Sequence, residues 1–505
     1  MPPAAGNRVL YERLAAVLAA VLVAAVALAL FLNGSLLSTW GAAHVDLSIN
    51  LTAAHALRDG DDPYGTTALL DRAEALGSPT ELIYSQLFTS YIQPPTSALS
   101  LLPLTTLAWR DATHVYLVLN HVFLFAAVGL TLNTFRPALP LRWLVAGAAV
   151  VGAAYAQVNA SLALGQVDAT ILLLLAVGLW GYLRGNAPLT GAAIAFAAAI
   201  KLIPGLLLLY FLWRREHRVV IWGAGVGLAL FLVSLAYAGA GVYESYLTET
   251  LPALSKGSTH YSNASLGALI ARAHTPEVVR GPSTGAGRGL PEMLYLDEVP
   301  EGAWARLASV GVVVGALAGL ALVIPHRQVS RQGAGRSPLP PGEGGGEGAG
   351  PPPRTAGLIL EYYLVVAVGL AISSVTWEFY VIWLLPVFLA VFLAPERFLP
   401  GGPWRWGALA LFALLLVALN YPADCGSSLD CYLYEPNGLF YHPGWVPAVR
   451  VERALGLYAT HLDAVLFLRL PALLLLTAGL ASLARWSRKQ PQRESAELRV
   501  QRTQT

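Results

Sequence analysis

The stretch GQVDATILLLLAVGLWGYLRGNAPLTGAAIAFAAAIKLIPGLLLL, from Gly165 to Leu209, decides the fold class of this chain. It contains one uncharged apolar segment at Ala169 to Leu183 and most of a second at Pro188 to Trp213. A helix needs about 20 predominantly apolar residues to cross the hydrocarbon core of a bilayer. Apolar segments that approach this length predict membrane helices rather than the core of a water-soluble domain.

The composition of the whole chain agrees with this prediction. Hydrophobic residues make up 56% of the 505 residues, charged residues only 12%, and the mean hydropathy is +0.57. A soluble domain carries about 25% charged residues. The formal net charge of +2 argues against a nucleic-acid partner. The two cysteines are too few for a disulfide-rich scaffold or a CxxC-type metal site.

Apolar segments recur from one end of the chain to the other. Besides the two above, they are Leu14–Leu32, Tyr91–Ala108, Val115–Leu132, Trp143–Leu164, Val219–Val242, Leu307–Ile324, Tyr362–Val375, Val375–Leu393, Trp406–Tyr421 and Ala464–Ala484. Because only closed helical hydrogen bonding satisfies a backbone in lipid, they predict an all-α, polytopic integral membrane protein with about twelve transmembrane helices. A signal peptide has a shorter apolar core, so we interpret the first segment as a retained span, with cleavage as the alternative.

The basic residues predict the orientation of these helices. A cytoplasmic N-terminus places most arginine clusters inside, as the positive-inside rule requires, whereas Arg136, Arg142 and Arg184 fall on the outer side. Three long polar loops are then external, namely residues 33–90, 243–303 and 422–463. Short inner connections and large outer loops suggest chemistry on the external face of the cell membrane.

The chain divides into four regions. They are an N-terminal membrane region (1–326), a Gly/Pro-rich cytoplasmic linker (327–356), C-terminal membrane helices (357–485) and a basic cytoplasmic tail (486–505). The linker contains SPLPPGEGGGEGAGPPPR, which cannot bury enough apolar surface to fold. The tail suits anionic lipid headgroups. Cys425 and Cys431 lie in the third external loop, where an oxidising environment could join them or leave them free.

Asp46 is the candidate general base. It lies in the first external loop, about a dozen residues after the first span, and begins a helix-like stretch with Leu47, Leu51 and Leu57 on one face. We expect this stretch to lie along the membrane surface. A carboxylate beside low-dielectric surroundings has a raised pKa and can accept a proton near neutral pH. The alternative is that Asp46 caps the helix that follows it.

Two charged residues are expected within the membrane. Lys201 lies in AAIKLIPG, and Glu378 lies in SSVTWEFYVIWLLP. A charge at that depth is costly, so each is either functional or paired inside the bundle. Lys201 could also snorkel to the interface in a purely structural role. Gln166 precedes the apolar segment at Ala169 and is a further candidate for substrate binding.

Polar residues of the external loops are candidates for substrate binding. Asp61 and Tyr64 lie in DGDDPYG, whose composition is equally typical of a solvated turn. In the second loop, Asn263 begins the segment NASL. Arg272 could grip a lipid-linked phosphate with paired hydrogen bonds, although a lone loop arginine is more often merely solvated.

Signatures of cofactor and metal chemistry are missing from the sequence. It has no Gly-rich phosphate loop, no HExxH, no GxSxG and no Cys/His metal pattern. We therefore expect no cofactor and no metal. The lack of a recognisable internal or inverted repeat weighs mildly against a repeat-built transporter.

Taken in order, these stretches resemble glycosyltransferase family 87, a family of polytopic membrane enzymes of the GT-C type. The resemblance extends from about Leu14 to about Leu393. It rests on Asp46 with the GDDPYG segment, on YIQPPTSALSLLPL, and above all on the stretch that begins at Gly165. Weaker similarities are NASLGALIAR and SSVTWEFYVIWLLP. The family includes bacterial mannosyltransferases and arabinofuranosyltransferases.

The resemblance implies an activity. A polyprenyl-phosphate sugar would be the donor, a lipid or cell-envelope glycan the acceptor, and the reaction would be inverting, outside the membrane, without nucleotide sugar or metal. Asp46 matches the family's first-loop catalytic aspartate, which deprotonates the acceptor hydroxyl. Lys201 matches the lysine of the family's "aalK" helix, and Gln166 matches its "GQ" pair. These matches make Asp46 the expected catalytic residue and place the other two at the site.

One departure from the family pattern concerns the donor. Many members carry a histidine shortly after the tryptophan of the tenth-span motif, where this chain reads Trp377-Glu378-Phe379-Tyr380. If that histidine holds the donor phosphate, His260 or Arg272 would take its place here. Two other functions stay open on the sequence: a transporter or flippase of lipid-linked sugars, and an envelope protein that binds polyprenyl lipids without catalysis.

Overall fold

The computed structural model describes residues 37–40, 44–64, 66–77, 91–135, 155–257, 263–274, 302–326, 353–419 and 470–488, together with Leu18 and Leu22. Within these ranges the chain forms helices and turns, with one isolated β-bridge between Asn263 and Trp377 and no strand. The prediction of an all-α fold is therefore confirmed over the described residues. The first expected span, the Gly/Pro-rich linker and the loop with both cysteines lie outside them.

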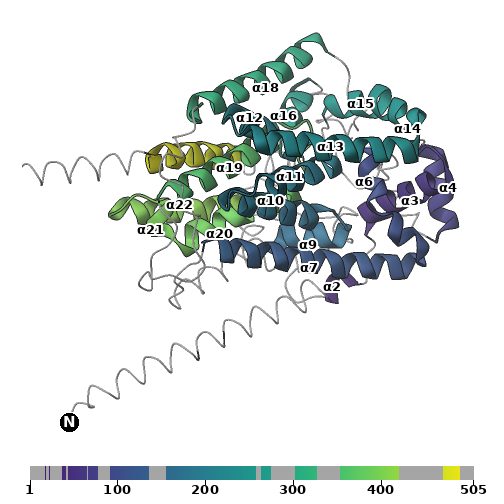
Figure 1. The fold of residues 1–505 in the computed structure, drawn as a ribbon, viewed down its shortest axis with the longest axis horizontal. Coiled ribbons are helices and arrows are strands. Elements are labelled where there is room, and N and C mark those ends of the chain that lie inside the picture. Colours follow the sequence, from purple (N-terminus) through teal and green to yellow (C-terminus); the bar gives the residue numbers. More distant parts are fainter. Residues whose placement is uncertain are drawn as a thin grey trace, which may run out of the picture.

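The helices follow one another along the chain in this order: α2 Leu37–Trp40, α3 Val45–Asp59, α4 Thr66–Ala75, α6 Pro95–Leu99, η2 Leu102–Thr106, α7 Trp109–Phe135, α9 Tyr155–Leu164, α10 Asp168–Leu183, α11 Ala187–Ile200, η3 Ile203–Gly205, α12 Leu206–Trp213, α13 His217–Ala238, α14 Ala240–Ser245, η4 Tyr246–Thr250, α15 Leu251–Ser255, α16 Leu266–His274, α18 Ala303–Val323, α19 Pro353–Ile372, η5 Glu378–Leu384, α20 Leu385–Leu393, α21 Pro395–Phe398 and α22 Pro403–Leu419. A last helix covers Leu470–Arg488. Figure 1 shows α3, α4 and α6 at one end of the molecule and α21 and α22 at the opposite end.

Four helices among the described residues are long and apolar enough to cross a membrane: Trp109–Thr134 within α7, α13, α18 and Leu470–Arg488. The pair α9 and α10 adds a fifth if it counts as one span bent by 119°. No buried residue lies in the apolar window of α18, and only 17% of the window of α13 is buried. Apolar surfaces of this kind require lipid tails around them, so the protein is integrated in a membrane.

Two segments predicted as single spans are broken in the structure. Tyr91–Ala108 begins extended and then forms only the short helices α6 and η2. Pro188–Trp213 ends its first helix at Ile200, and Lys201 is extended at φ −137° and ψ 130°. Pro204 explains this break, because a proline there lacks the amide that would bond to the Ile200 carbonyl and its ring would clash with that carbonyl. The count of about twelve spans is not reached in the described residues.

The chain reverses at this break, so α12 runs back along α11. A Cβ on Gly205 would lie 3.5 Å from the Cβ of Ala198. The rings of Tyr182 and Phe211 are 4.7 Å apart, and the Tyr182 hydroxyl donates to Glu216 at 3.3 Å. The end of α12 thus lies beside the end of α10, where Arg184 follows. Arg184 therefore shares one end of the bundle with the cluster Arg214, Arg215 and Arg218, although the positive-inside prediction from the sequence placed this cluster inside and Arg184 outside.

A buried ionic cluster marks the same end. The Glu361 carboxylate of α19 lies 3.6 Å from Nη1 of Arg214 and 2.9 Å from Nε of Arg488. Tyr210 donates its hydroxyl proton to the same carboxylate at 3.2 Å. Arg488 belongs to the last helix, so this cluster joins the C-terminal helix to α12 and α19. We call it the Glu361 cluster.

Close helix contacts form the centre of the bundle. α11 packs against α13 at Gly191, where an added Cβ would lie 2.5 Å from the carbonyl oxygen of Val219 and 2.6 Å from the amide of Gly223. Glycine is required there because the two backbones approach too closely for any side chain. Figure 1 places α10 and α11 in the middle of the molecule, between α13 and α7. This core fixes the ends of α10 and α11, where the candidate site is built.

Candidate functional site

Asp46 lies in the first turn of α3, a helix that is buried in the protein. Leu47, Leu51 and Leu57 are at most 3% exposed and belong to the main hydrophobic core. The prediction that this stretch lies along the membrane surface is therefore wrong, because protein covers its apolar face. The N-cap of α3 is His44, so the capping role proposed for Asp46 is also wrong. Asp46 itself is half-buried.

Residue 44 precedes the helix in a strained conformation. His44 has φ 47° and ψ 52°, a left-handed geometry that is uncommon outside glycine. Its Nδ1 lies 3.2 Å from the Leu162 carbonyl, which ties the start of α3 to the end of α9. Burial lowers the pKa of His44 to about 4, so the ring is neutral at physiological pH. Strain of this kind persists only where the surrounding packing enforces it, and it clusters at functional sites.

The turn between α9 and α10 brings a second polar group to Asp46. Gly165 has φ +69°, and a Cβ on it would lie 2.5 Å from the Cβ of Leu47. Only glycine lets this turn meet the first turn of α3. The next residue, Gln166, donates a hydrogen bond from Nε2 to Oδ2 of Asp46. The GQ pair thus has a geometric reason: the glycine permits the approach and the glutamine makes the contact.

Gln166 is in turn held by a buried ion pair. Lys201 donates from Nζ to Oε1 of Gln166 at 3.1 Å and to Oδ1 of Asp168 at 2.9 Å. The side chain of Lys201 is 4% exposed and that of Asp168 is fully buried. The end of helix α11 at Ile200 is important here, because it places Lys201 beside the first turn of α10. Lys201, the lysine predicted to lie within the membrane, is therefore paired. In the hydrogen-bond path a single side chain, that of Gln166, separates it from Asp46, the predicted base.

Two aromatic residues of η5 complete this group. The Nε1 of Trp383 donates to Oδ1 of Asp168 at 3.0 Å, and the Nζ of Lys201 lies 3.8 Å from the ring centroid of Tyr380. The rings of Tyr380 and Trp383 stack at 5.0 Å with an interplanar angle of 7°. Ser161 adds a weak hydrogen bond to Asp168 at 3.4 Å. We call Asp46, Gln166, Lys201 and Asp168 the polar relay.

Asp168, Tyr380 and Trp383 were not among the residues singled out from the sequence. Asp168 had a usable signal, because it is a carboxylate directly before an apolar segment and an intramembrane lysine needs a partner. Tyr380 and Trp383 had no such signal, since an aromatic residue in an apolar segment more often packs in the core or lies at the membrane interface. In that segment the sequence analysis singled out Glu378, whose side chain lies outside the described residues.

Asp61 and Tyr64 are used in contacts within the protein. Arg72 forms an ion pair with Asp61 and another with Asp59. Hydrogen bonds from Arg58 and Arg72 lower the pKa of Asp59. The hydroxyl of Tyr64 donates to the Gln93 carbonyl at 2.8 Å, and burial raises its pKa above the usual value. The DGDDPYG segment therefore joins α3, α4 and the residues before α6.

Asn263 also makes internal contacts. Its Nδ2 donates to the Ser374 carbonyl at 3.1 Å, and its Oδ1 accepts from the amide of Thr376 at 2.9 Å. It thereby fixes the segment that leads into η5. Arg272 belongs to α16, but its side chain lies outside the described residues, and His260 lies outside them entirely.

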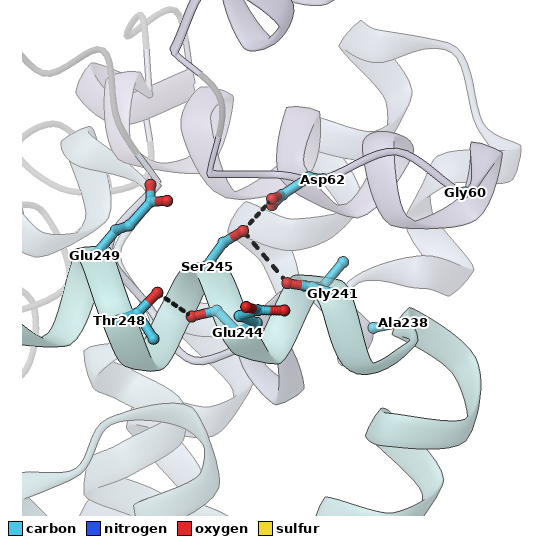
Figure 2. Close-up of a pocket in the computed structure, with 9 residues that line it drawn as sticks. Gly60, Asp62, Ala238, Gly241, Glu244, Ser245, Thr248 and Glu249 are labelled. Atoms are coloured by element: carbon cyan, nitrogen blue, oxygen red, sulfur yellow. Dashed lines mark hydrogen bonds between the residues drawn. The ribbon is translucent and has the colours of Figure 1, made fainter.

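A hollow opens where the turn after α3 meets α14 and η4. Its volume is about 470 Å³, and it is lined by Gly60, Asp62, Ala238, Gly241, Val242, Glu244, Ser245, Thr248 and Glu249. Figure 2 shows Ser245 donating to Asp62, at 2.5 Å, across the hollow. The lining has three carboxylates and two hydroxyls, and none of its residues is basic. Such a surface suits a neutral ligand rich in hydroxyl groups and repels a phosphate.

The arrangement can perform proton transfer. Asp46 is the half-buried carboxylate of the polar relay, whereas Asp168 is neutralised by Lys201 and shielded from solvent. A carboxylate with one oxygen oriented by an amide can accept a proton at the other. Among the described residues, no group of three His, Cys, Asp or Glu side chains is placed to hold a metal ion.

Comparison with known proteins assigns the family. The sequence model of glycosyltransferase family 87 matches residues 91–336, whereas no curated protein and no solved structure matches the chain. The matched range contains Gln166, Asp168 and Lys201, while Asp46 precedes it and Trp383 follows it. The family predicted from the sequence is thus confirmed. Through residues 91–336 the chain belongs to glycosyltransferase family 87, and it is a glycosyltransferase.

Proposed function

We propose that the protein transfers a hexose, with mannose as the first candidate, or a pentose from a polyprenyl-phosphate sugar to a lipid or cell-envelope glycan. Asp46 is the general base in this proposal. The observation that carries it is the position of Asp46: a half-buried carboxylate, oriented by Gln166, which belongs to the family-matched residues 91–336. The family supplies the reaction class, and the site supplies the group that takes the proton.

The charge distribution supports an external active site. Arg184 follows α10 and Arg214 follows α12, at the end that also carries the Glu361 cluster. Asp46 contacts Gln166, which precedes the other end of α10. The helix has 16 residues, so it separates the two ends by about 24 Å. If basic residues mark the cytoplasmic side, Asp46 lies on the external side.

The chemistry follows from a single displacement. The acceptor hydroxyl attacks the anomeric carbon, its proton passes to Asp46, and the bond between that carbon and the phosphate oxygen breaks. Polyprenyl phosphate leaves with the electron pair of the broken bond, and the configuration at carbon inverts. A positioned general base contributes about 10²–10⁴-fold to such a reaction. A lipid-linked donor keeps its anomeric carbon near the headgroups, as a site at the membrane boundary requires.

The hollow lined by Asp62 and Glu249 supports the acceptor half of the proposal. Its carboxylates and hydroxyls match the hydroxyl groups of a glycan, and their charge disfavours the donor phosphate there. It lies beyond Gly60 at the far end of α3, and α3 is 15 residues long. At 1.5 Å per residue the hollow is about 20 Å from Asp46, so it suits a distal part of an elongated acceptor.

The test replaces Asp46 by asparagine in protein reconstituted in lipid nanodiscs. Asp46→Asn keeps the size of the side chain and removes the base, so transfer from a synthetic polyprenyl-phosphate sugar should fall by about 10²–10⁴-fold. The control is Asp71→Asn, which neutralises an exposed carboxylate on α4. Full activity of Asp46→Asn would refute the base assignment. Direct use of UDP- or GDP-sugars by the parent protein would refute the lipid-linked donor.

The same purified protein, reconstituted in proteoliposomes, tests the transport alternative. Lys201 is 4% exposed and paired with Asp168, which weighs against a role in lining a path through the membrane. Counterflow of labelled substrate in proteoliposomes, without sugar transfer, would favour a transporter instead.

A further inference from the structure

We propose that Lys201 and Asp168 are positioning residues that set the orientation of the catalytic carboxylate through Gln166, and that Lys201 is not a ligand of the donor phosphate. This inference rests on the proposed function, because it takes Asp46 as the base. It assigns a role to the buried ion pair that neither the family match nor the sequence supplies.

The first step concerns the amide of Gln166. Its Oε1 accepts from Nζ of Lys201, so its Nε2 must face Asp46. A flipped amide would bring Nε2 against the ammonium, two donors together, and Oε1 against the carboxylate, two acceptors together. Lys201 therefore selects one of the two orientations of the amide, the one that donates to Asp46.

The second step concerns the hydrogen-bonding capacity of Lys201. An ammonium has three donors. One is directed to Gln166 and one to Asp168, and the ammonium also lies over the ring of Tyr380 at 3.8 Å. A residue that bound a substrate phosphate would need a free donor and an open approach. Two of the three donors of Lys201 are used within the protein, its ammonium lies over the Tyr380 ring, and the residue is 96% buried, so its effect reaches the reaction through Gln166.

The third step concerns the rigidity of the pair. Asp168 accepts from Lys201 and from the indole of Trp383, so two groups fix its carboxylate. Breaking a buried pair by removing one partner leaves an uncompensated charge, whereas removing both charges avoids that cost. This asymmetry allows an experiment in which the relay is disconnected without burying a lone charge.

Charge at this site makes the relay visible in a pH profile. Lys201 interacts electrostatically with Asp46, and the titratable hydroxyls that face these carboxylates are Tyr116 of α7 and Tyr380 of η5. Both tyrosines are neutral near pH 7, and His44 is neutral above about pH 5. Among the described residues, Lys201 is the cation that favours the ionised, base-competent form of Asp46, and Asp168 carries the opposing negative charge. Removal of Lys201 alone should move the acid limb of kcat/KM to higher pH, whereas removal of both charges should move it little.

The experiment compares variants in nanodiscs with a synthetic polyprenyl-phosphate sugar as donor. The first, Gln166→Leu, removes the amide and leaves the ion pair intact. The second carries both Lys201→Met and Asp168→Asn, which removes both charges. For each variant, kcat should fall by about 10–10²-fold with little change in the KM for the donor, because the base is misplaced rather than the substrate lost. In the second, the acid limb of kcat/KM should move little, because a cation and an anion are removed together.

Coupling provides a sharper test. The triple variant combines Gln166→Leu, Lys201→Met and Asp168→Asn. If the ion pair acts through Gln166, its kcat should equal that of Gln166→Leu within about threefold, because all three substitutions act on the same path. The control is Glu361→Gln in the Glu361 cluster, a carboxylate that is equally buried but lies at the other end of the bundle. It should lower thermal stability and leave the pH profile of kcat/KM unchanged.

The outcomes separate this inference from the proposed function. A double variant with the parent kcat would overturn the positioning role, and so would a raised donor KM at unchanged kcat, which indicates a direct phosphate ligand. Activity retained by Asp46→Asn would instead remove the proposed base itself. If the double variant does not fold, the parent kcat in Gln166→Leu would still overturn the inference, because the ion pair would then have no path to Asp46.

Discussion

Replacing Gly165 by alanine should move the carboxylate of Asp46, the proposed base. Residue 165 has φ +69°, which costs an alanine about 1–2 kcal/mol. The new Cβ would also lie 2.5 Å from the Cβ of Leu47 and 3.3 Å from that of His44, so α3 must shift by about 1 Å to reach ordinary contact distance. Overpacking of this kind costs about 1–3 kcal/mol. The total loss of stability should therefore be about 2–5 kcal/mol.

The shift of α3 has a separate effect on activity. Asp46 is one residue before Leu47 on the same turn, so it moves with the clash. A displacement of about 1 Å at a reacting group can reduce the rate by about 10²-fold. The assay measures sugar transfer and thermal unfolding of the same nanodisc preparation.

A matched control separates the cost of the positive φ from the clash of the new Cβ with α3. Gly185, in the turn between α10 and α11, has φ +72°, but a Cβ there would meet no described atom within 4 Å. Gly185→Ala should therefore lose about 1–2 kcal/mol of stability and keep its activity. If both glycine variants lose activity to the same extent, the contact between Gly165 and α3 does not position the base, and the reasoning fails.

Two further predictions concern His44 and the hollow near Glu249. His44 has a pKa of about 4 in the folded protein, below its usual 6.5, so the unfolded state binds the extra proton between these values and stability should rise with pH from about 4 to 6.5. The rise is at most about 3 kcal/mol, and His44→Asn, which tolerates the left-handed backbone, should remove it from pH-dependent unfolding curves. A variant with the parent pH slope would contradict this. Glu249→Gln should raise the KM for the acceptor by about tenfold, since a hydrogen bond to a charged group contributes about 1.5–3 kcal/mol, and leave the KM for the donor unchanged. A change in the donor KM alone would show that the hollow does not hold the acceptor.

Apolar length predicted the long helices but not the reversals between helices. The segments at Val115, Val219 and Leu307 correspond to α7, α13 and α18, because an uninterrupted apolar run has few alternatives to a membrane helix. The segment at Pro188 contains Pro204, yet hydropathy averages over a proline and does not register a change of direction. Because the reversal of the chain at Lys201 was not predicted, Arg184 was assigned to the wrong end of the bundle relative to Arg214.

The site was partly predictable because some of its residues carry a local signature. Asp46, Gln166 and Lys201 stand out as polar groups in or beside apolar segments, and the structure brings these three together. Asp168 had a local signal of the same kind, but its role depends on a partner 33 residues away, and Trp383 gave no signal because its partner is 215 residues away. The burial of α3 was also missed, because an amphipathic helix has the same sequence pattern whether lipid or protein covers its apolar face.

The distance along the chain between Asp168 and Trp383 bears on how the protein is made. The indole that completes the carboxylate's hydrogen bonds is synthesised 215 residues later, roughly 10–40 s at ordinary translation speeds. During that interval α10 and α11 are already emerging from the ribosome, with Asp168 and Lys201 in an apolar hairpin. Within that hairpin Asp168 and Lys201 can neutralise each other before the indole is made, and Trp383 joins the pair when η5 docks.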